Sequence, residues 1–202
     1  MNKPDLSGFS VTDLIDKEKG TLYSLIFYSC GLVFGSFLYF LVNSTSATKA
    51  MKELFLGAKG DFLRLFFSNF SLYFSVFMVC ILLGLCIVGF SVIYGVSLFS
   101  GLFLGLKIAY FYVNFAFKGF AYSILMIIPE GAALMTVLIY TIDISIKLSS
   151  MIYKSASGKE QGSAKEIKSL LTKYLVYALA VTLIALINST LTIMLKEIII
   201  LN

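Results

Sequence analysis

Three ionisable residues, Lys107, Glu130 and Asp143, lie within long apolar stretches of the sequence, where they could do chemistry. Charged side chains are rare at membrane depth because an unpaired charge there is costly. Those that occur usually pair with one another or mark a pathway for an ion or a substrate. The three residues therefore indicate either a polar pathway through a membrane or a set of structural ion pairs.

Each of these residues also has a purely structural interpretation, which the sequence leaves open. Lys107 and Glu130 can pair and lock two helices together, or Glu130 can cap a helix that starts at Pro129, where the helix dipole favours a carboxylate. Asp143 precedes Lys147 by four residues, which is the favourable order for an ion pair on one helix.

The composition excludes several kinds of catalytic site. The chain has no histidine, which rules out zinc-protease motifs and Ser-His-Asp catalysis. Cys30, Cys80 and Cys86 lie in apolar runs without a CxxC, so we expect buried free thiols. No GxxxxGK[ST] loop occurs, and no serine–lysine spacing specifies a catalytic dyad. We therefore expect no enzyme activity, no catalytic residue, no cofactor and no metal site.

The elements that position these residues must lie in lipid. Residues 65–106 carry no charge, and as one helix they would extend about 63 Å, roughly twice the hydrocarbon thickness of a bilayer. Hydrophobic residues form 59% of the chain, against about 45–50% in soluble domains. We predict an all-α, polytopic bundle in the bilayer. The net charge of +5 is then explained by topology and lipid headgroups, and we expect no nucleic acid partner.

The charge and hydropathy pattern predicts about five transmembrane helices in a single membrane domain. Proline removes a backbone hydrogen bond and clashes one turn back, so we predict that the fourth span breaks near Pro129 and Gly131. The predicted segments are a polar N-terminal segment at 1–20, spans at 21–43, 65–88, 91–117, 119–153 and 174–195, a connection at 44–64 with a short amphipathic helix, and a basic loop at 154–173.

Basic residues set the predicted orientation of the spans. Residues 147–173 hold six lysines, and the connection at 44–64 holds four basic residues. The positive-inside rule places the N-terminus and the 147–173 segment in the cytoplasm. The connection at 44–64 would then lie outside the cell.

Small residues recur at a spacing that lets helix backbones approach closely. They indicate either packing within the bundle or a face for a partner protein or a second copy of the chain. Residues 31–35 and 101–105 also resemble each other, as in an internal repeat of a transporter, although ordinary membrane-helix composition explains the likeness more simply. The small residues are Ser97, Gly101, Gly105 and Ala109 on the third span and Gly31 and Gly35 on the first.

The order of these features resembles stage II sporulation protein M, a family of bacterial integral membrane proteins. Wider relatives often carry Pro-His-Gly followed by an acid, whereas Glu130 here takes the histidine place and Leu134 the place of the acid. The resemblance rests on a span ending at Asn43, the segment Leu-Gly-Leu-Cys-Ile-Val-Gly at 83–89, the spacing of Gly101 and Gly105, Gly119-Phe120, Ile128-Pro129, and a helix ending in Lys147-Leu148.

The resemblance implies a multi-pass protein of the bacterial cell membrane that acts in the engulfment step of endospore formation. It also implies that the chain is a scaffold for membrane-anchored partners that remodel peptidoglycan, the stage II sporulation proteins D and P. Such a scaffold would bind through its small-residue faces and the connection at 44–64. The alternative is a small transporter, channel or lipid-translocating protein that uses Lys107, Glu130 and Asp143.

Overall fold

The computed structural model describes residues 11–41, 51, 55, 62–86, 89–156 and 164–195, and every element in these ranges is helical. The all-α prediction is therefore confirmed. The elements are α1 (Val11–Leu41), α3 (Phe62–Leu85), the short α4 (Gly89–Val92), α5 (Tyr94–Tyr122), the π-helical η1 (Ser123–Ile127), α6 (Ile128–Ala156) and α7 (Ala164–Leu195).

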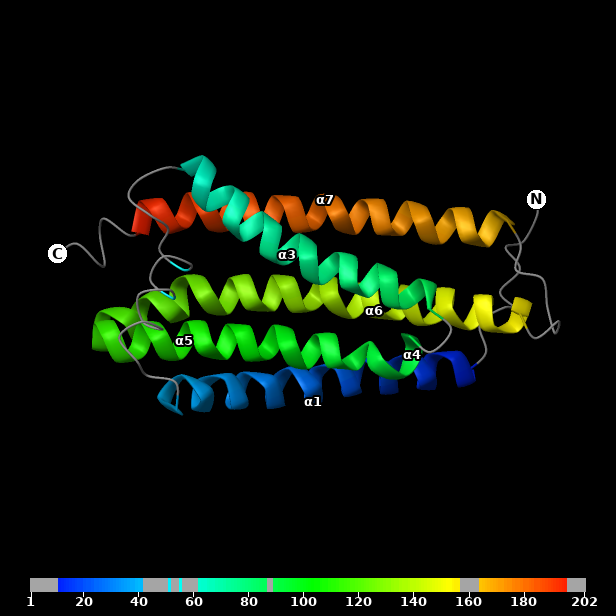
Figure 1. Cartoon of the computed structure of the whole chain (residues 1–202), viewed down its shortest axis with the longest axis horizontal. Helices are drawn as coiled ribbons and strands as arrows, with labels where there is room; N and C mark the ends of the chain where they lie inside the picture. Colours follow the sequence, from blue (N-terminus) through cyan, green and yellow to red (C-terminus); the bar gives the residue numbers. More distant parts are fainter. Residues whose placement is uncertain are drawn as a thin grey trace, which may run out of the picture.

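The long helices lie roughly along one common axis and alternate in direction along the chain, so α1, α5 and α7 run one way and α3 and α6 the other (Figure 1). The neighbours α1 and α5 are therefore parallel. α1 packs on α5, α6 lies between α5 and α7, and α3 crosses α6 and α7. The first residue of α1 and the last residue of α7 lie at opposite ends of the bundle. This order brings segments that are distant in sequence, such as α3 and α7, into contact.

Four helical stretches of the described residues are long and apolar enough to cross a bilayer: Lys19–Leu41, Phe62–Leu85, Tyr94–Ser155 and Glu166–Met194. The third has 62 residues and would extend about 93 Å as a straight helix, about three times the hydrocarbon thickness. Instead, it folds back on itself as α5 and α6 (Figure 1). The chain is therefore a multi-pass membrane protein.

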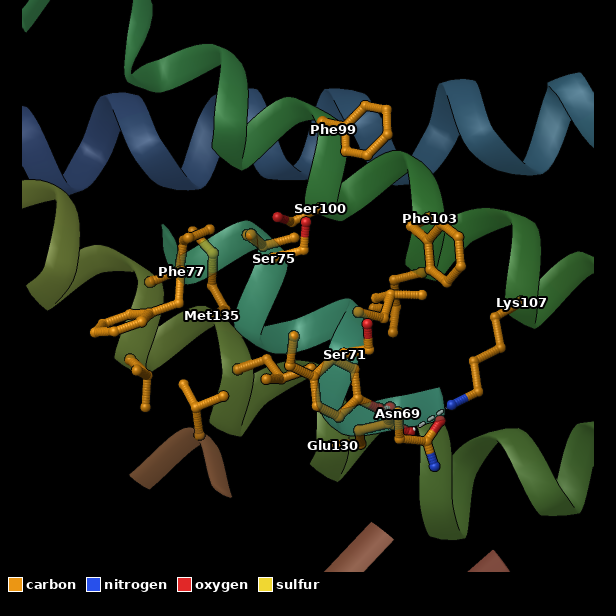
Figure 2. Close-up of a pocket in the computed structure, with 18 of the residues that line it drawn as sticks. Asn69, Ser71, Ser75, Phe77, Phe99, Ser100, Phe103, Lys107, Glu130 and Met135 are labelled. Carbon is orange, nitrogen blue, oxygen red and sulfur yellow. Dashed lines mark hydrogen bonds and ion pairs between the residues drawn. The ribbon is translucent and has the colours of Figure 1, made fainter. Parts of the chain in front are cut away.

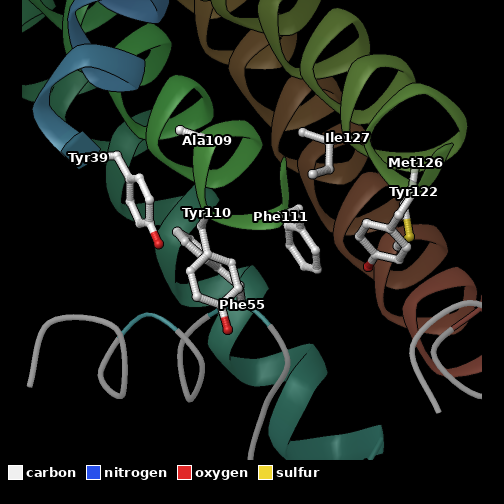
Figure 3. Packing of buried hydrophobic residues seen from close by; sticks show 8 residues of the cluster. All are labelled: Tyr39, Phe55, Ala109, Tyr110, Phe111, Tyr122, Met126 and Ile127. Carbon is white, nitrogen blue, oxygen red and sulfur yellow. The ribbon is translucent and has the colours of Figure 1, made fainter. Parts of the chain in front are cut away.

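The chain reverses direction at Ala116, which has φ 47° and ψ −124°. It is the only non-glycine residue with positive φ in the part of the chain that the structure describes. On either side of this turn, the rings of Phe111 and Tyr122 stack with their centroids 4.5 Å apart (Figure 3). Aromatic packing thus holds a backbone conformation that an L-residue adopts only at a cost of about 1–3 kcal/mol.

The chain stays helical through Pro129, so the prediction of a helix break at this residue is wrong. The interruption is η1, which lies in the turn before Pro129, and α6 begins at Ile128. A π turn is wider than an α turn, which gives room for a proline ring that lacks an N–H donor. Gly131 lies inside α6, where an added Cβ would lie 2.6 Å from Leu104 Cδ2. Glycine at this position therefore lets α6 pack closely against Leu104 of α5 and does not break the helix.

Several predicted boundaries also shift. α3 covers Phe62–Leu85 where the sequence predicted 65–88. α7 begins at Ala164, ten residues before the predicted start at 174, so much of the predicted basic loop at 154–173 is helix. The helix extends beyond the predicted span because lysines continue a helix as well as apolar residues do.

The predicted amphipathic helix in the connection falls largely outside the described residues. Within 44–61 the structure describes Met51 and Phe55, and both are helical. The centroid of the buried Phe55 ring lies 5.7 Å from that of Phe103 and 5.6 Å from that of Tyr110. Figure 3 shows Phe55 beside Tyr110. This contact fastens the connection to α5.

The two small-residue strips pack against each other between α1 and α5. A Cβ added at Gly31 would lie 2.1 Å from the carbonyl oxygen of Leu98, and one added at Gly101 would lie 2.1 Å from that of Tyr28. Gly35 and Gly105 make the same kind of contact at 2.0 and 2.1 Å. Ser97 and Ala109 are buried as well. The strips thus serve packing within the bundle.

The likeness between 31–35 and 101–105 has a counterpart in this interface. Because α1 and α5 are parallel, equivalent positions of the two segments face each other, as in a pair of helices related by a two-fold axis. Further along, the rings of Tyr39 and Tyr110 meet edge to face at 6.3 Å, and Asn114 Nδ2 donates to the Tyr39 hydroxyl at 2.8 Å. Like segments therefore pair with each other within one chain.

Replacement of Gly101 by alanine should lower the free energy of unfolding by about 1–3 kcal/mol, because its Cβ would force two backbones apart. Thermal unfolding in detergent measures the effect. Gly95→Ala is the matched control, since a Cβ there meets nothing within 4 Å. Equal stability of the two variants would contradict the α1–α5 interface.

Replacement of Ala116 by glycine should raise the free energy of unfolding by about 1 kcal/mol, because glycine adopts positive φ without steric cost. Ala116→Val should lower it, since a β-branched residue fits this conformation worse. The same thermal measurement applies to both. A stabilising valine would show that the chain does not turn at this residue.

Candidate functional site

Glu130, in the first turn of α6, is the centre of a buried polar network that joins helices. Its Oε2 accepts a hydrogen bond from Lys107 Nζ of α5 at 2.7 Å, and its Oε1 accepts one from the Tyr73 hydroxyl of α3. Glu130 and Lys107 are each only 8% exposed. One carboxylate therefore ties three helices together (Figure 2).

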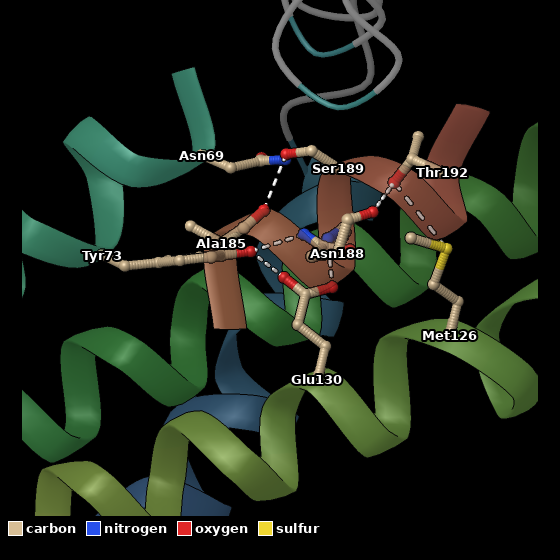
Figure 4. Close-up of polar contacts among 9 residues, drawn as sticks. Asn69, Tyr73, Met126, Glu130, Ala185, Asn188, Ser189 and Thr192 are labelled. Carbon is tan, nitrogen blue, oxygen red and sulfur yellow. Dashed lines mark hydrogen bonds and ion pairs between the residues drawn. The ribbon is translucent and has the colours of Figure 1, made fainter. Parts of the chain in front are cut away.

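Helix α7 closes the network from the other side (Figure 4). Asn188 Nδ2 donates to the Tyr73 hydroxyl at 2.8 Å, and the Thr192 hydroxyl donates to the backbone carbonyl of Asn188 at 2.8 Å. One turn earlier on α3, Asn69 Nδ2 donates to the Ser189 hydroxyl at 3.2 Å. Tyr73 thus passes a chain of hydrogen bonds from α7 to the carboxylate on α6.

The geometry corresponds to the pairing of Lys107 with Glu130 and not to a helix cap. Both carboxylate oxygens contact side chains, and the backbone N–H of Ile128 at the start of α6 already donates to the Ser123 carbonyl. The helix continues upstream through η1, so Glu130 does not meet the free N–H groups of a helix start. The Tyr28 hydroxyl of α1 donates to the Gly131 carbonyl at 3.3 Å, which brings a fifth helix to this turn.

Asp143 lies apart from the network. Its Oδ2 pairs with Lys147 Nζ at 3.0 Å on α6, and the Lys147 side chain is 57% exposed. Thirteen residues separate Asp143 from Glu130, which is about 20 Å along a helix. The three ionisable residues therefore belong to two separate ion pairs, the second completed by Lys147, and do not line one continuous pathway.

Sequence reasoning missed Tyr73 and Asn188, the residues that extend the network. The available signal was the cluster Asn188-Ser189-Thr190 within the last span, since intramembrane amides and hydroxyls hydrogen-bond across helices. Asn188 is 3% exposed, and its Oδ1 has no partner among the described residues. Tyr73 gave no comparable signal, because tyrosine is common in membrane spans.

A cleft of about 560 Å³ lies between α3, α5 and α6 and reaches the ion pair (Figure 2). Lys107 and Glu130 form its polar end together with Tyr73. Apolar residues such as Phe77 and Phe99, together with several serines, line the rest of its length. The buried network is therefore also one wall of a cleft.

The fold and the network define a class: a polytopic helical membrane protein whose deeply buried charges are paired inside the bundle. Comparison with protein families then identifies the chain. The model of the Stage II sporulation protein M family matches residues 24–192, and the chain belongs to that family. The matched range includes Tyr73, Lys107, Glu130 and Asn188. No curated protein and no solved structure matches the chain.

Substitution of Lys107 by methionine should lower the free energy of unfolding by about 3–5 kcal/mol, because it leaves the buried Glu130 carboxylate without its counter-charge. The double variant Lys107→Met/Glu130→Gln should lose less than the single variant, since glutamine is neutral and still accepts from Tyr73. Thermal unfolding in detergent measures both effects.

The control for this double-mutant cycle is Lys147→Met, which removes the exposed pair with Asp143 and should cost about 0.5 kcal/mol or less. A Lys107→Met variant as stable as Lys147→Met would mean that the buried pair does not hold the helices together.

Proposed function

We propose that the protein is a non-enzymatic scaffold of the bacterial cell membrane that recruits peptidoglycan-remodelling proteins during endospore engulfment. The observation that supports this role is the use of Lys107 and Glu130 to join helices, since each group is engaged by the other inside the bundle. A scaffold needs a rigid frame, and a four-helix network built on one carboxylate provides it. Membership in a sporulation family supports the engulfment role.

The scaffold's partner-binding surface does not include the two glycine strips, because α1 and α5 bury them in each other. The connection at 44–64 is the better candidate. Phe55 fastens it to the end of the bundle, and the predicted orientation places it outside the cell, on the side of the peptidoglycan. Its partners would be membrane-anchored enzymes similar to the stage II sporulation proteins D and P.

A transporter or channel is the second candidate function, favoured by the cleft that reaches Lys107 and Glu130. In that case, Glu130→Gln would stop flux in proteoliposomes while the bundle stays folded. In a scaffold, the same change lowers thermal stability and leaves partner recruitment intact in the folded fraction.

The scaffold role is tested with the variant Lys49→Ser/Lys52→Ser/Lys59→Ser, which removes basic residues from the connection and keeps Phe55. Recruitment through this segment should be weakened, because charged groups steer and orient partners at an interface. The measurement is co-purification of cell-wall remodelling proteins from sporulating cells. Wild-type thermal stability of the variant shows that the bundle is intact.

The matched control removes the same number of lysines from the start of α7, as Lys165→Ser/Lys168→Ser/Lys173→Ser. This control should retain the partners, because the predicted orientation places these lysines on the cytoplasmic side. Equal yields of partner from both triple variants would rule out recruitment through the connection.

A further inference from the structure

The cleft between α3, α5 and α6 has the size of a ligand site. Its volume of about 560 Å³ falls within the range of about 300–1,000 Å³ typical of small-molecule pockets. Its size favours a single small amphiphile.

One wall of the cleft offers hydroxyl groups that no protein group satisfies. Ser68, Ser71 and Ser75 lie on α3, line the cleft and are exposed to it. They form no hydrogen bond within the described residues, whereas Ser100 across the cleft donates to its own helix at the Val96 carbonyl. A hydroxyl without a partner in hydrocarbon is unfavourable. These serines are therefore free to bond oxygen or hydroxyl groups of a molecule in the cleft.

The rest of the lining is aromatic and aliphatic. Phe99 and Phe103 lie along the α5 side, and Phe77 and Met135 lie beyond the serines (Figure 2). Phe99 is 60% exposed, so it stands at the rim and not in the protein core. Such a surface fits an acyl chain, and the serine wall fits the oxygens of its head.

The head of this ligand must be neutral, for two reasons. The charges at the polar end cancel, because Lys107 and Glu130 are 2.7 Å apart. The site is also deep: Lys107 lies nine residues from the turn at Ala116 and thirteen from Tyr94, about 13 Å and 20 Å along α5. A phosphate at that depth would lose its hydration without gaining an unpaired cation.

We propose that this cleft binds one neutral glycerolipid from the bilayer, a diacylglycerol. Its hydroxyl and ester oxygens bond Ser71 and Ser75, and an acyl chain lies along Phe99 and Phe103. This inference goes beyond the scaffold role and does not rest on it.

The chain has no tryptophan, which makes a direct test available. Phe99→Trp places a single indole at the rim of the cleft, and Phe37→Trp places one on α1, away from the cleft. The two positions are equally exposed, at 60% and 59%. The full-length variants are reconstituted in phosphatidylcholine vesicles that contain a small fraction of diacylglycerol brominated on its acyl chains. Loss of indole emission then reports the contact.

The expected result is a larger loss of emission at position 99 than at position 37. Phosphatidic acid with the same brominated chains should quench both positions alike. Ser71→Leu/Ser75→Leu in the Phe99→Trp background should remove this excess quenching at position 99. Ser150→Leu, which changes an exposed serine on α6 outside the cleft, should leave the excess quenching unchanged. Phe103→Trp is a second reporter in the cleft should the first variant be unstable.

Three results would overturn the proposal. Equal quenching at positions 99 and 37 would mean that the cleft has no preference for this lipid. A greater excess with phosphatidic acid would mean that the head is anionic. Persistence of the excess in Ser71→Leu/Ser75→Leu would place the lipid elsewhere.

Discussion

The bundle depends on the cost of placing a charge in hydrocarbon. Lys107 and Glu130 are both buried, so neither can lower its free energy by hydration, and each must find its partner in the protein. Pairing at 2.7 Å fixes α5 against α6. The second carboxylate oxygen accepts from Tyr73, and Tyr73 accepts from Asn188, so the same constraint extends to α3 and α7. One buried ion pair, extended by hydrogen bonds, thereby holds four helices in register.

Close backbone contact provides the specificity that the apolar surfaces cannot. Lipid tails solvate leucine and phenylalanine as well as a protein interior does, so hydrophobicity alone does not choose a partner helix. Gly31 and Gly101 instead allow α1 and α5 to come into direct backbone contact, and Ser36 adds a hydrogen bond to the Gly105 carbonyl at 3.3 Å. The ion pair and the glycine interface both involve α5, which therefore joins α1 to the rest of the bundle.

The sequence predicted those features that follow from local composition. An uncharged run of 42 residues can only be membrane helix, and the pairing of Lys107 with Glu130 is one of the interpretations that the sequence offers, because isolated charges are costly. The sequence did not predict the features that tertiary contacts determine. The turn falls at Ala116, an unremarkable residue held in positive φ by Phe111 and Tyr122, whereas Pro129 is accommodated by η1. Tyr73 could not be singled out, because its role depends on contacts with α6 and α7 that form only in the folded bundle.

The ion pair and the cleft are parts of one structure and not two separate sites. Tyr73 belongs to both, since its hydroxyl bonds Glu130 and its ring lines the cleft. Lys107 likewise faces the cleft while it pairs with Glu130. A molecule in the cleft would therefore contact the residues that fix α3 and α5 to α6. Its binding to the folded bundle would stabilise that bundle by an amount that rises with the ratio of its concentration to its Kd. Binding of the proposed lipid and packing of the helices would then be thermodynamically linked through Tyr73 and Lys107.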